Sequence, residues 1–246
     1  MELLTRSVGA LSTGELTGFV LWALVMISVP ILKWILGSGA ERVGISIGVL
    51  VQAGLVLFVM GHYLSPGRLL LTVLGDPVLG WLPEYIGSKS GVPFGRYQYT
   101  DILRPQIGHV PVIIPLAWLM MMPPAWTVAA IVVGVENRLL TALVAGAAFT
   151  AWDFFLDPQM VRWNFWQWER PRGYFGIPWI NFLGWFIVGS AISYLLLPVN
   201  AGEMEVLYLV FVVTWFLEGF GQFFFWRLRG PGIAGLLLRG VFVAVS

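Results

Sequence analysis

Long apolar runs, separated by short polar or Pro/Gly-rich segments, follow one another along most of the chain. A helix needs about 20 mostly apolar residues to cross the hydrocarbon core of a bilayer. The runs therefore predict seven spans, near residues 17–36, 43–62, 67–82, 107–122, 139–156, 179–197 and 204–226. The run 125–135 is too short to cross alone and is predicted to lie at the interface. The expected fold class is all-α: a polytopic integral membrane protein with about seven transmembrane helices.

The composition fits a chain embedded in lipid. Of 246 residues, 58% are hydrophobic and 11% are charged, and a soluble domain with this balance would expose large apolar patches. The length accommodates the predicted spans with short loops, so residues 1–246 are expected to form a single transmembrane helical domain. The N-terminus lacks the pattern of a cleaved signal peptide, and the first helix is expected to direct insertion.

The basic residues predict an orientation. With seven spans, one face receives Lys33, Arg42, Lys89, Arg96, Arg104, Arg162, Arg170, Arg172, Arg227, Arg229 and Arg239, and the other receives Arg6, Arg68 and Arg138. Cytoplasmic loops carry an excess of lysine and arginine. We therefore expect a multi-pass protein of the cell membrane with its N-terminus outside. Loops 83–106 and 158–178 then share the cytoplasmic face, where they can build one site.

Several kinds of chemistry lack the residues that they need. The chain has no cysteine and only two histidines, His62 and His109, which argues against thiolate nucleophiles and against di-iron enzymes that need histidine clusters. The last predicted span contains no lysine for a retinal Schiff base. Because the net charge is only +1 and the basic residues are scattered, membrane lipids are expected partners and nucleic acid is not. No metal site and no cofactor are predicted.

Acidic residues inside apolar runs are expensive in a membrane and are therefore candidates for function. Asp76, Asp153, Asp157 and Glu218 meet this description. Asp153 and Asp157 lie four residues apart, so a helix places both carboxyl groups on one face. Two carboxylates this close in a low dielectric do not both ionise easily. One of them is expected to stay protonated at neutral pH and to suit general acid catalysis.

These acids also have structural interpretations. Asp157 directly precedes Pro158 and can mark the end of a helix. Asp153 can pair with Arg162 or with another helix. Glu218, inside the last predicted span, is expected either to pair with an arginine or to complete the site.

Aromatic residues are dense between positions 152 and 186. Their ring faces can stabilise a carbocation, although an aromatic belt at the headgroup level accounts for part of this density. The segment EYIGSKSGVPFGRYQY, at 84–99, adds an acid, basic residues and tyrosines that can close over the same face. As a loop it says little by itself, because Gly, Pro and Ser are ordinary turn residues.

Three segments carry a resemblance to a known family. The segment at 84–99, AWDFFLDPQM at 151–160, and GYFGIP at 173–178 with NFLGW at 181–185 resemble the CruF-type carotenoid 1,2-hydratases of bacteria and archaea. The resemblance spans most of residues 84–186. It implies carotenoid biosynthesis by a cofactor-independent hydro-lyase, which adds water across the terminal 1,2 double bond of an acyclic (psi) end group to give a tertiary alcohol. The implied lipophilic substrates are lycopene, gamma-carotene or a bisanhydrobacterioruberin-like carotenoid.

Protonating such an alkene at its less substituted carbon leaves a tertiary cation, so the site needs an acid, ring faces around the cation and a positioned water. We expect Asp153 to donate the proton and Asp157 or Glu84 to orient water or to restore the proton. The full set of expected catalytic residues is Asp153, Asp157, Glu84 and Glu218. The expected substrate-binding residues are Trp152, Phe155, Trp163, Trp166, Tyr174, Phe175, Asn181, Trp185 and Tyr97.

Two other functions are compatible with these residues. A prenyltransferase of the UbiA kind, such as a lycopene elongase, holds magnesium and a diphosphate with a D-x-x-x-D helix, which Asp153 and Asp157 match. Such enzymes carry a second aspartate-rich motif, and the chain has no other aspartate pair. A non-catalytic carotenoid- or lipid-binding membrane protein would need only the aromatic groove.

Overall fold

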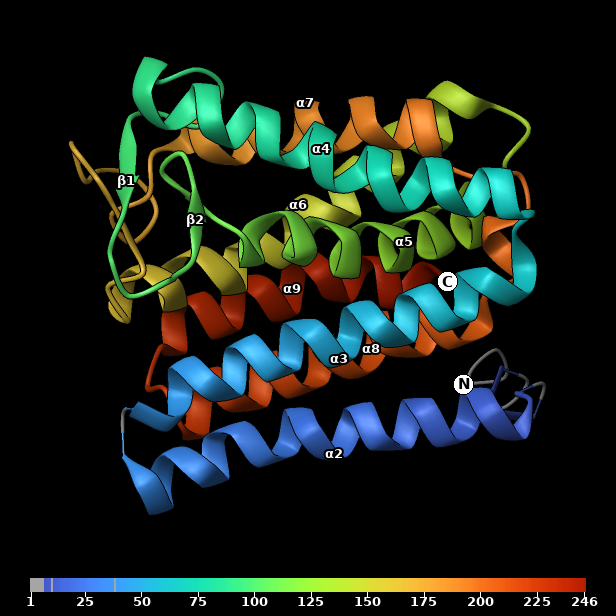
Figure 1. Ribbon diagram of the computed structural model, residues 1–246, viewed down its shortest axis with the longest axis horizontal. Coiled ribbons are helices and arrows are strands. Elements are labelled where there is room, and N and C mark those ends of the chain that lie inside the picture. Colours follow the sequence, from blue (N-terminus) through green and yellow to red (C-terminus); the bar gives the residue numbers. More distant parts are fainter. Residues whose placement is uncertain (1–6, 10, 38) are drawn as a thin grey trace.

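The computed structural model describes residues 7–9, 11–37 and 39–246. The long helices lie side by side in one bundle (Figure 1). They are α2 (Thr13–Leu36), α3 (Gly39–Tyr63), α4 (Pro66–Ser90), α5 (Ile113–Val133), α6 (Arg138–Arg162), α7 (Trp179–Leu196), α8 (Glu205–Phe224) and α9 (Arg229–Val245). Within the described residues, the seven helices from α2 to α8 are long and apolar enough to cross a membrane. The predicted fold class is thus confirmed.

Helix α5 includes most of the run 125–135, and the prediction of a separate interfacial segment was wrong. The predicted span 107–122 begins too early, because strands β2 (Gln106–Ile107) and β3 (Val110–Pro111) form a hairpin there. The crossing therefore starts later along the chain and uses residues up to 133.

Helix α5 continues through Pro123 and Pro124, and a neighbouring helix replaces one of the hydrogen bonds that these prolines remove. Pro124 has no N–H to donate to the carbonyl of Met120. The side chain of Gln52, on α3, donates to that oxygen at 3.2 Å. Gln52 itself is held in place by Trp22, whose indole nitrogen donates to the amide oxygen at 3.1 Å.

Helices α4 and α6 also extend through prolines that suggested boundaries in the sequence. α4 passes Pro83 and α6 passes Pro158. Glu84, expected in a loop, is therefore a buried helical residue, and Asp157 does not end its helix. A proline removes one backbone donor, and packing against neighbouring helices keeps such a segment helical in a membrane protein.

Helix α9 lies outside the predicted spans. It has 17 residues and packs against α6 and α8. Figure 1 shows it running alongside the other helices, so that the start of α2 and the end of α9 lie at the same end of the bundle. Arg239, expected on the cytoplasmic face, is fully buried within α9. That placement was wrong, because residues 229–245 form a helix that packs against α6 and α8 and buries Arg239 along its length.

The two long loops meet at one end of the bundle. Strand β1 (Tyr97–Tyr99), from the first loop, pairs antiparallel with β4 (Trp166–Trp168), from the second. The expectation that both loops share one face is confirmed. A 3-10 turn, η1 (Ala201–Glu203), lies near the other end, between α7 and α8.

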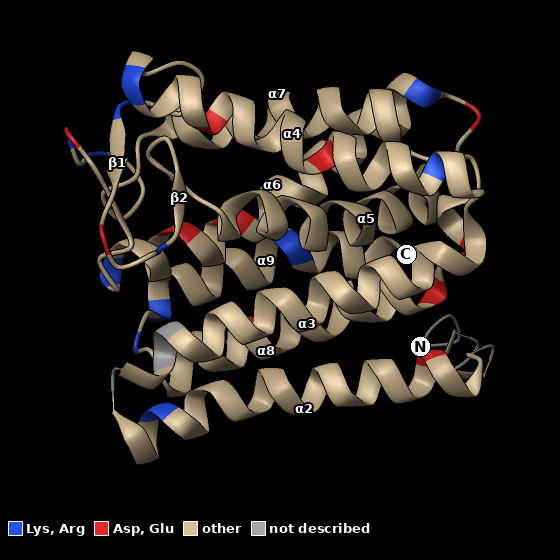
Figure 2. Ribbon diagram, in the orientation of Figure 1, with Lys and Arg blue, Asp and Glu red and all other residues tan. Residues whose placement is uncertain are grey.

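Basic residues gather at the end of the bundle that carries β1 and β2 (Figure 2). By their positions along the chain, the basic residues at this end are Lys33, Lys89, Arg96, Arg104, Arg162, Arg170, Arg172, Arg227 and Arg229, whereas Arg68 and Arg138 lie at the opposite end. Arg6 is outside the described residues, and so is the side chain of Arg42. The predicted asymmetry in charge therefore holds for the described residues, with Arg239 as the exception.

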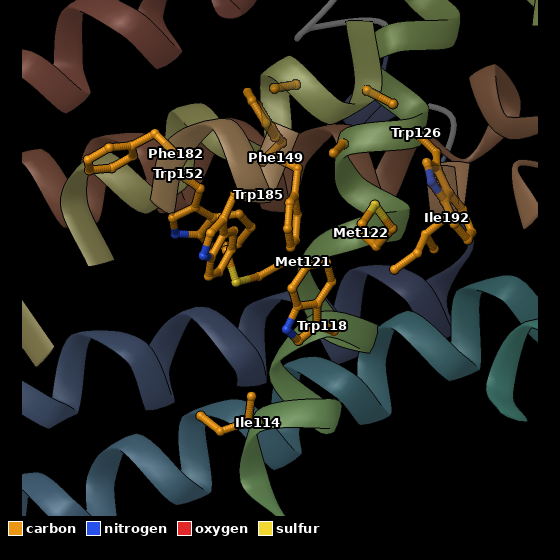
Figure 3. Close-up of a cluster of buried hydrophobic side chains, with 14 of the residues drawn as sticks. Ile114, Trp118, Met121, Met122, Trp126, Phe149, Trp152, Phe182, Trp185 and Ile192 are labelled. Atoms are coloured by element: carbon orange, nitrogen blue, oxygen red, sulfur yellow. The ribbon is translucent and has the colours of Figure 1, made fainter. Parts of the chain in front are cut away.

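Aromatic rings are prominent in a cluster of buried hydrophobic side chains (Figure 3). The rings of Trp118, Phe149 and Trp185 contact one another with centroids 4.8 to 5.1 Å apart. Gly80 makes room for this cluster, because a Cβ at that position would lie 2.6 Å from Cγ of Trp118. The close approach of α4 and α5 lets Trp118 reach the polar site described next.

Candidate active site

Asp153 and Asp157 form a buried pair with a shared hydrogen-bond donor. Both lie on one face of α6, as their spacing predicts. Nδ2 of Asn181, in the first turn of α7, donates to Oδ2 of Asp153 at 2.9 Å and to Oδ2 of Asp157 at 2.5 Å. Nε1 of Trp166, on β4, donates to Oδ1 of Asp157 at 2.9 Å. Asp153 is therefore held by Asn181 rather than by Arg162.

The donors are distributed unequally over this pair. Both oxygens of Asp157 accept an N–H, whereas Oδ1 of Asp153 has no partner among the described residues. Hydrogen-bond donors favour the charged form of a carboxyl group, and burial without donors favours the neutral form. The arrangement therefore suits a charged Asp157 beside a protonated Asp153.

Glu84, on α4, is surrounded by three donors. Its Oε2 accepts hydrogen bonds from the hydroxyl groups of Tyr97 and, at 2.9 Å, Tyr99. Its Oε1 accepts from Nε1 of Trp118 at 3.3 Å. Burial first, and then the negative charge of Glu84, raises the pKa of both tyrosines well above the ordinary value. The hydroxyl groups thus stay protonated and donate to the carboxyl group of Glu84.

The β1–β4 pairing connects the two acidic groups. Tyr99 lies opposite Trp166 in the register, and Tyr97 lies opposite Trp168. The rings of Tyr99 and Trp166 make an edge contact with centroids 5.8 Å apart. Tyr99 donates to Glu84, and Trp166 donates to Asp157. Two short strands from separate loops therefore fix the positions of donors to both acids.

Glu84 and Asp157 border an apolar cavity of about 340 Å³. Its wall includes residues from the helices α2 to α8 and from the strands β1 and β4. Of the residues expected from the sequence, the cavity is lined by Glu84, Tyr97, Asp157, Trp163, Trp166, Asn181, Trp185 and Glu218. Carboxyl groups and aromatic faces thus meet in a space large enough for part of a lipophilic molecule.

Five expected residues do not line the cavity: Asp153, Trp152, Phe155, Tyr174 and Phe175. Asp153 lies behind Asp157, fully buried, and the ring of Trp152 lies against Arg239. Phe155 packs against α9, while the hydroxyl of Tyr174 donates to the carbonyl of Phe154. Phe175 is exposed on the loop. The four aromatic residues among these five are of the same type as the aromatic residues that line the cavity. Only helix packing decides which aromatic residues reach the cavity.

Arg239 contributes a buried positive charge near α8. Its Nη2 donates to the carbonyl of Phe211 at 2.7 Å and to Oγ1 of Thr214 at 2.5 Å. The guanidinium carbon lies 4.0 Å from the ring centroid of Trp152 and 4.1 Å from that of Phe211. Thr214 and Glu218 are one turn apart and both line the cavity. Arg239 interacts electrostatically with Glu218, which compensates part of its charge.

Sequence reasoning missed several polar groups of the site. Tyr99 could have been found from Tyr97, since alternate residues of a strand share a face. Gln52 is a lone amide within an apolar run, and it lines the cavity together with Gln159. Trp118 gave no signal, because an indole inside an apolar run looks like any other core residue.

Other titratable residues lie apart from this site. Asp76 is fully buried on α4, and neither carboxyl oxygen has a hydrogen-bond partner among the described residues. His109 contacts Oγ of Ser88 at 2.6 Å, and His62 contacts the carbonyl of Phe58. In the part of the chain that the structure describes, no three His, Asp or Glu side chains are grouped as ligands for a metal.

The fold and the site together define a polytopic α-helical membrane protein with buried carboxyl groups at the wall of an apolar cavity. The model of the carotenoid biosynthesis protein family matches residues 43–238, and the chain belongs to this family. The resemblance seen in the sequence is thus confirmed.

The chain is also similar to bisanhydrobacterioruberin hydratase from Haloarcula japonica, with 30% identity over 110 residues. The match covers 44% of this chain and 37% of that protein, so it spans little more than a third of the relative's length. No solved structure matches the chain. The family assigns the chain to carotenoid biosynthesis, and its seven long apolar helices fit a membrane protein.

Proposed function

We propose that this protein hydrates the terminal 1,2 double bond of an acyclic carotenoid end group. The observation that carries the proposal is the pair Asp153 and Asp157, joined by Asn181 at the wall of an apolar cavity. A relative named as a hydratase supports the same class of reaction. The candidate substrates are lycopene, gamma-carotene and a bisanhydrobacterioruberin-like carotenoid.

Hydration requires a proton and a water molecule, and no oxidant or reductant. A proton adds to C-2 of the end group and leaves a tertiary cation at C-1. The oxygen of water then bonds to C-1, and the water gives up one proton. The protein must therefore lend one proton and take one back in each turnover.

Asp153 and Asp157 perform this exchange together in our proposal. Asp153, expected from the sequence to be the donor, holds the proton at rest, and the amide of Asn181 joins its side chain to that of Asp157. Because Asp157 lines the cavity and Asp153 does not, Asp157 is the group that touches the alkene. The proton of Asp153 passes to Asp157, which gives it to C-2. The carboxylate of Asp157 then takes one proton from the attacking water, and return of a proton to Asp153 restores the pair.

Negative charge and ring faces stabilise the cation in this mechanism. Glu84, which accepts hydrogen bonds from three donors and is taken as a carboxylate in this mechanism, lies at the same wall as Asp157. The rings of Trp163, Trp166 and Trp185 also line the cavity. A cation near an aromatic face gains about 2 kcal/mol or more when water is excluded. Glu218 adds a further carboxyl group from α8.

The end of the bundle that carries β1 and β4 is placed in the cytoplasm in this proposal. Most basic residues lie at that end, and the positive-inside rule assigns such an end to the cytoplasm. Both ends of the described chain, at α2 and α9, then lie outside. Labelling of single cysteines at Arg104 and Arg138 with an impermeant reagent tests this orientation.

The test is expression in cells that accumulate lycopene, followed by chromatography and mass spectrometry of the pigments. The parent protein is expected to give a product heavier by one water. Asp157→Asn and Asp153→Asn are each expected to lower its formation by about 100-fold or more, in line with the contribution of general acid catalysis. In deuterated water, the product should carry one solvent deuterium on C-2.

Other results would point to the alternatives. Elongated or prenylated products that require magnesium would favour a prenyltransferase. Bound carotenoid without any product, tested with lycopene and gamma-carotene, would favour a binding protein. Full hydration by Asp157→Asn and Asp153→Asn would leave the function in place and exclude these two residues as the proton source.

A further inference from the structure

The cavity extends from the buried acids to the outer surface of the bundle. At its inner end lies Asp157, which is 2% exposed. At its outer end the wall includes Ile27 on α2 and Phe216 on α8, which are 45% and 60% exposed. Figure 1 shows α2 at the edge of the bundle, and it packs chiefly against α3, with fewer contacts to α8.

The outer rim of the cavity is apolar on both helices. Ile27 and Ile31, one turn apart on α2, face the rim from one side, and Phe216 and Phe220, one turn apart on α8, face it from the other. All four side chains are exposed. In a helix that crosses a bilayer, an exposed apolar side chain at this depth contacts lipid tails. The rim therefore opens toward lipid rather than toward water.

Contacts at the end nearest the loops limit the opening. The rings of Trp34 on α2 and Phe225 after α8 lie 4.7 Å apart. The ammonium group of Lys33 lies 4.5 Å from the ring centroid of Trp226. Ring and cation contacts thus connect α2 with the end of α8 at the end of the bundle that carries β1 and β4. The exposed rim lies closer to the middle of both helices, at the depth of the hydrocarbon core.

The volume of the cavity requires such an opening if the substrate is a carotenoid. About 340 Å³ is near the lower limit of the roughly 300–1,000 Å³ that enclose a drug-sized ligand. A long polyene cannot fit inside, so only its end group can reach Asp157, and the rest of the chain must leave the cavity. A route through apolar side chains into lipid avoids exposing the polyene to water.

From this geometry we infer that the gap between α2 and α8 is a lateral portal, lined by Ile27, Ile31, Phe216 and Phe220, through which a carotenoid inserts one end from the bilayer. The polyene remains between the two helices while its end group lies at the acids. The inference rests on the proposed function for the identity of the ligand. Cysteine labelling measures the binding of lycopene separately from its hydration.

The absence of native cysteine allows a direct test of occupancy. Single cysteines are introduced as Ile27→Cys and Phe216→Cys, with Leu24→Cys as the matched control. Leu24 is also on α2 and also exposed, but it does not line the cavity. Each purified variant reacts with a lipid-soluble maleimide in liposomes with and without lycopene. Lycopene is expected to slow labelling at positions 27 and 216 several-fold and to leave position 24 unchanged.

Narrowing the portal tests its use during turnover. Ile27→Trp is expected to lower hydration of lycopene by tenfold or more, since displacement of a reacting group by about 1 Å can cost about 100-fold in rate. Leu24→Trp places the same large ring on the same helix outside the cavity and should retain activity. Size-exclusion profiles and thermal unfolding of both variants control for folding.

The outcomes separate the portal from the proposed reaction. Protection at positions 27 and 216 without any hydration would support the portal and overturn the hydratase assignment. Hydration with equal labelling at all three positions, or with full activity in Ile27→Trp, would overturn the portal and leave the hydratase assignment intact. Protection at position 24 as well would show nonspecific shielding by lycopene and would also count against the portal.

Discussion

Asn181 on α7 holds Asp157 on α6 through an amide-to-carboxyl hydrogen bond of 2.5 Å. The same nitrogen donates to Asp153. One amide thereby sets the separation of two carboxyl groups that lie one turn apart on another helix. The geometry of the candidate acid pair depends on the packing of α6 against α7, and changes at Asn181 test that dependence.

Replacing Asn181 by alanine is expected to lower the turnover number for hydration by about tenfold or more and to destabilise the fold by about 1–3 kcal/mol, because two buried carboxyl oxygens lose their donor. Pigment analysis and thermal unfolding in detergent measure the two effects. Ser190→Ala is the control, since this hydroxyl is also on α7 and also buried but has no partner among the described residues. Equal activity in both variants would contradict the role of Asn181.

The raised pKa of Tyr97 and Tyr99 predicts how thermal stability changes at alkaline pH. Their pKa is raised in the folded protein by burial and by Glu84, whereas an unfolded tyrosine ionises near pH 10. The protonated form is favoured by folding, so this contribution is complete below about pH 10 and is lost as the pH rises toward the folded pKa. The double variant Tyr97→Phe and Tyr99→Phe should show a shallower loss of thermal stability above about pH 10. The same slope in parent and variant would contradict the prediction.

Gly80 is expected to be intolerant of a methyl group. A Cβ there would lie 2.6 Å from the ring of Trp118, and overpacking of this kind costs about 1–3 kcal/mol. Gly80→Ala should also lower activity, because Trp118 donates to Glu84. Gly54→Ala is the matched control: it is also inside a helix, but nothing lies within 4 Å of its added Cβ. Gly54→Ala should be neutral or stabilising by up to about 1 kcal/mol.

Arg239 is expected to resist replacement even by lysine. Its planar guanidinium stacks between two rings and donates to two oxygens of α8, which a lysine ammonium cannot reproduce. Arg239→Lys should lower the free energy of unfolding by about 1–3 kcal/mol. Arg229→Lys, on the exposed first turn of α9, should remain within about 0.5 kcal/mol of the parent. Similar stability of the two variants would show that the stacking is unimportant.

The positions of prolines explain most of the errors made from the sequence. Two predicted spans ended at 82 and 122, directly before Pro83 and Pro123, and Pro158 was a possible helix end, yet each helix continues. The local sequence shows that a proline lacks a backbone N–H, but it does not show which other group donates the hydrogen bond instead. For Pro124 that partner is Gln52, which is distant in the chain. Glu84 was consequently expected in a loop and is found inside α4.

The sequence was enough to predict that the two acids share a helix face, but not which groups surround them. Asp153 and Asp157 share a face because the period of the helix places them there, whatever surrounds the helix. Which of the two reaches the cavity depends on how α6 packs against α7 and α9. Tyr99 and Trp118 bind Glu84 from a strand and from another helix, and no spacing along the chain relates those positions.

The sequence alone determined that the chain crosses a membrane, because the free energy of burying backbone and side chains in lipid depends on the length and apolar character of each local run. It also determined the acid pair and the resemblance to carotenoid 1,2-hydratases. Only the tertiary structure decided which aromatic rings line the cavity, how Asn181 joins the acids, and where Arg239 and α9 lie. These features depend on contacts between segments far apart in the chain, which the pattern of any single segment does not specify.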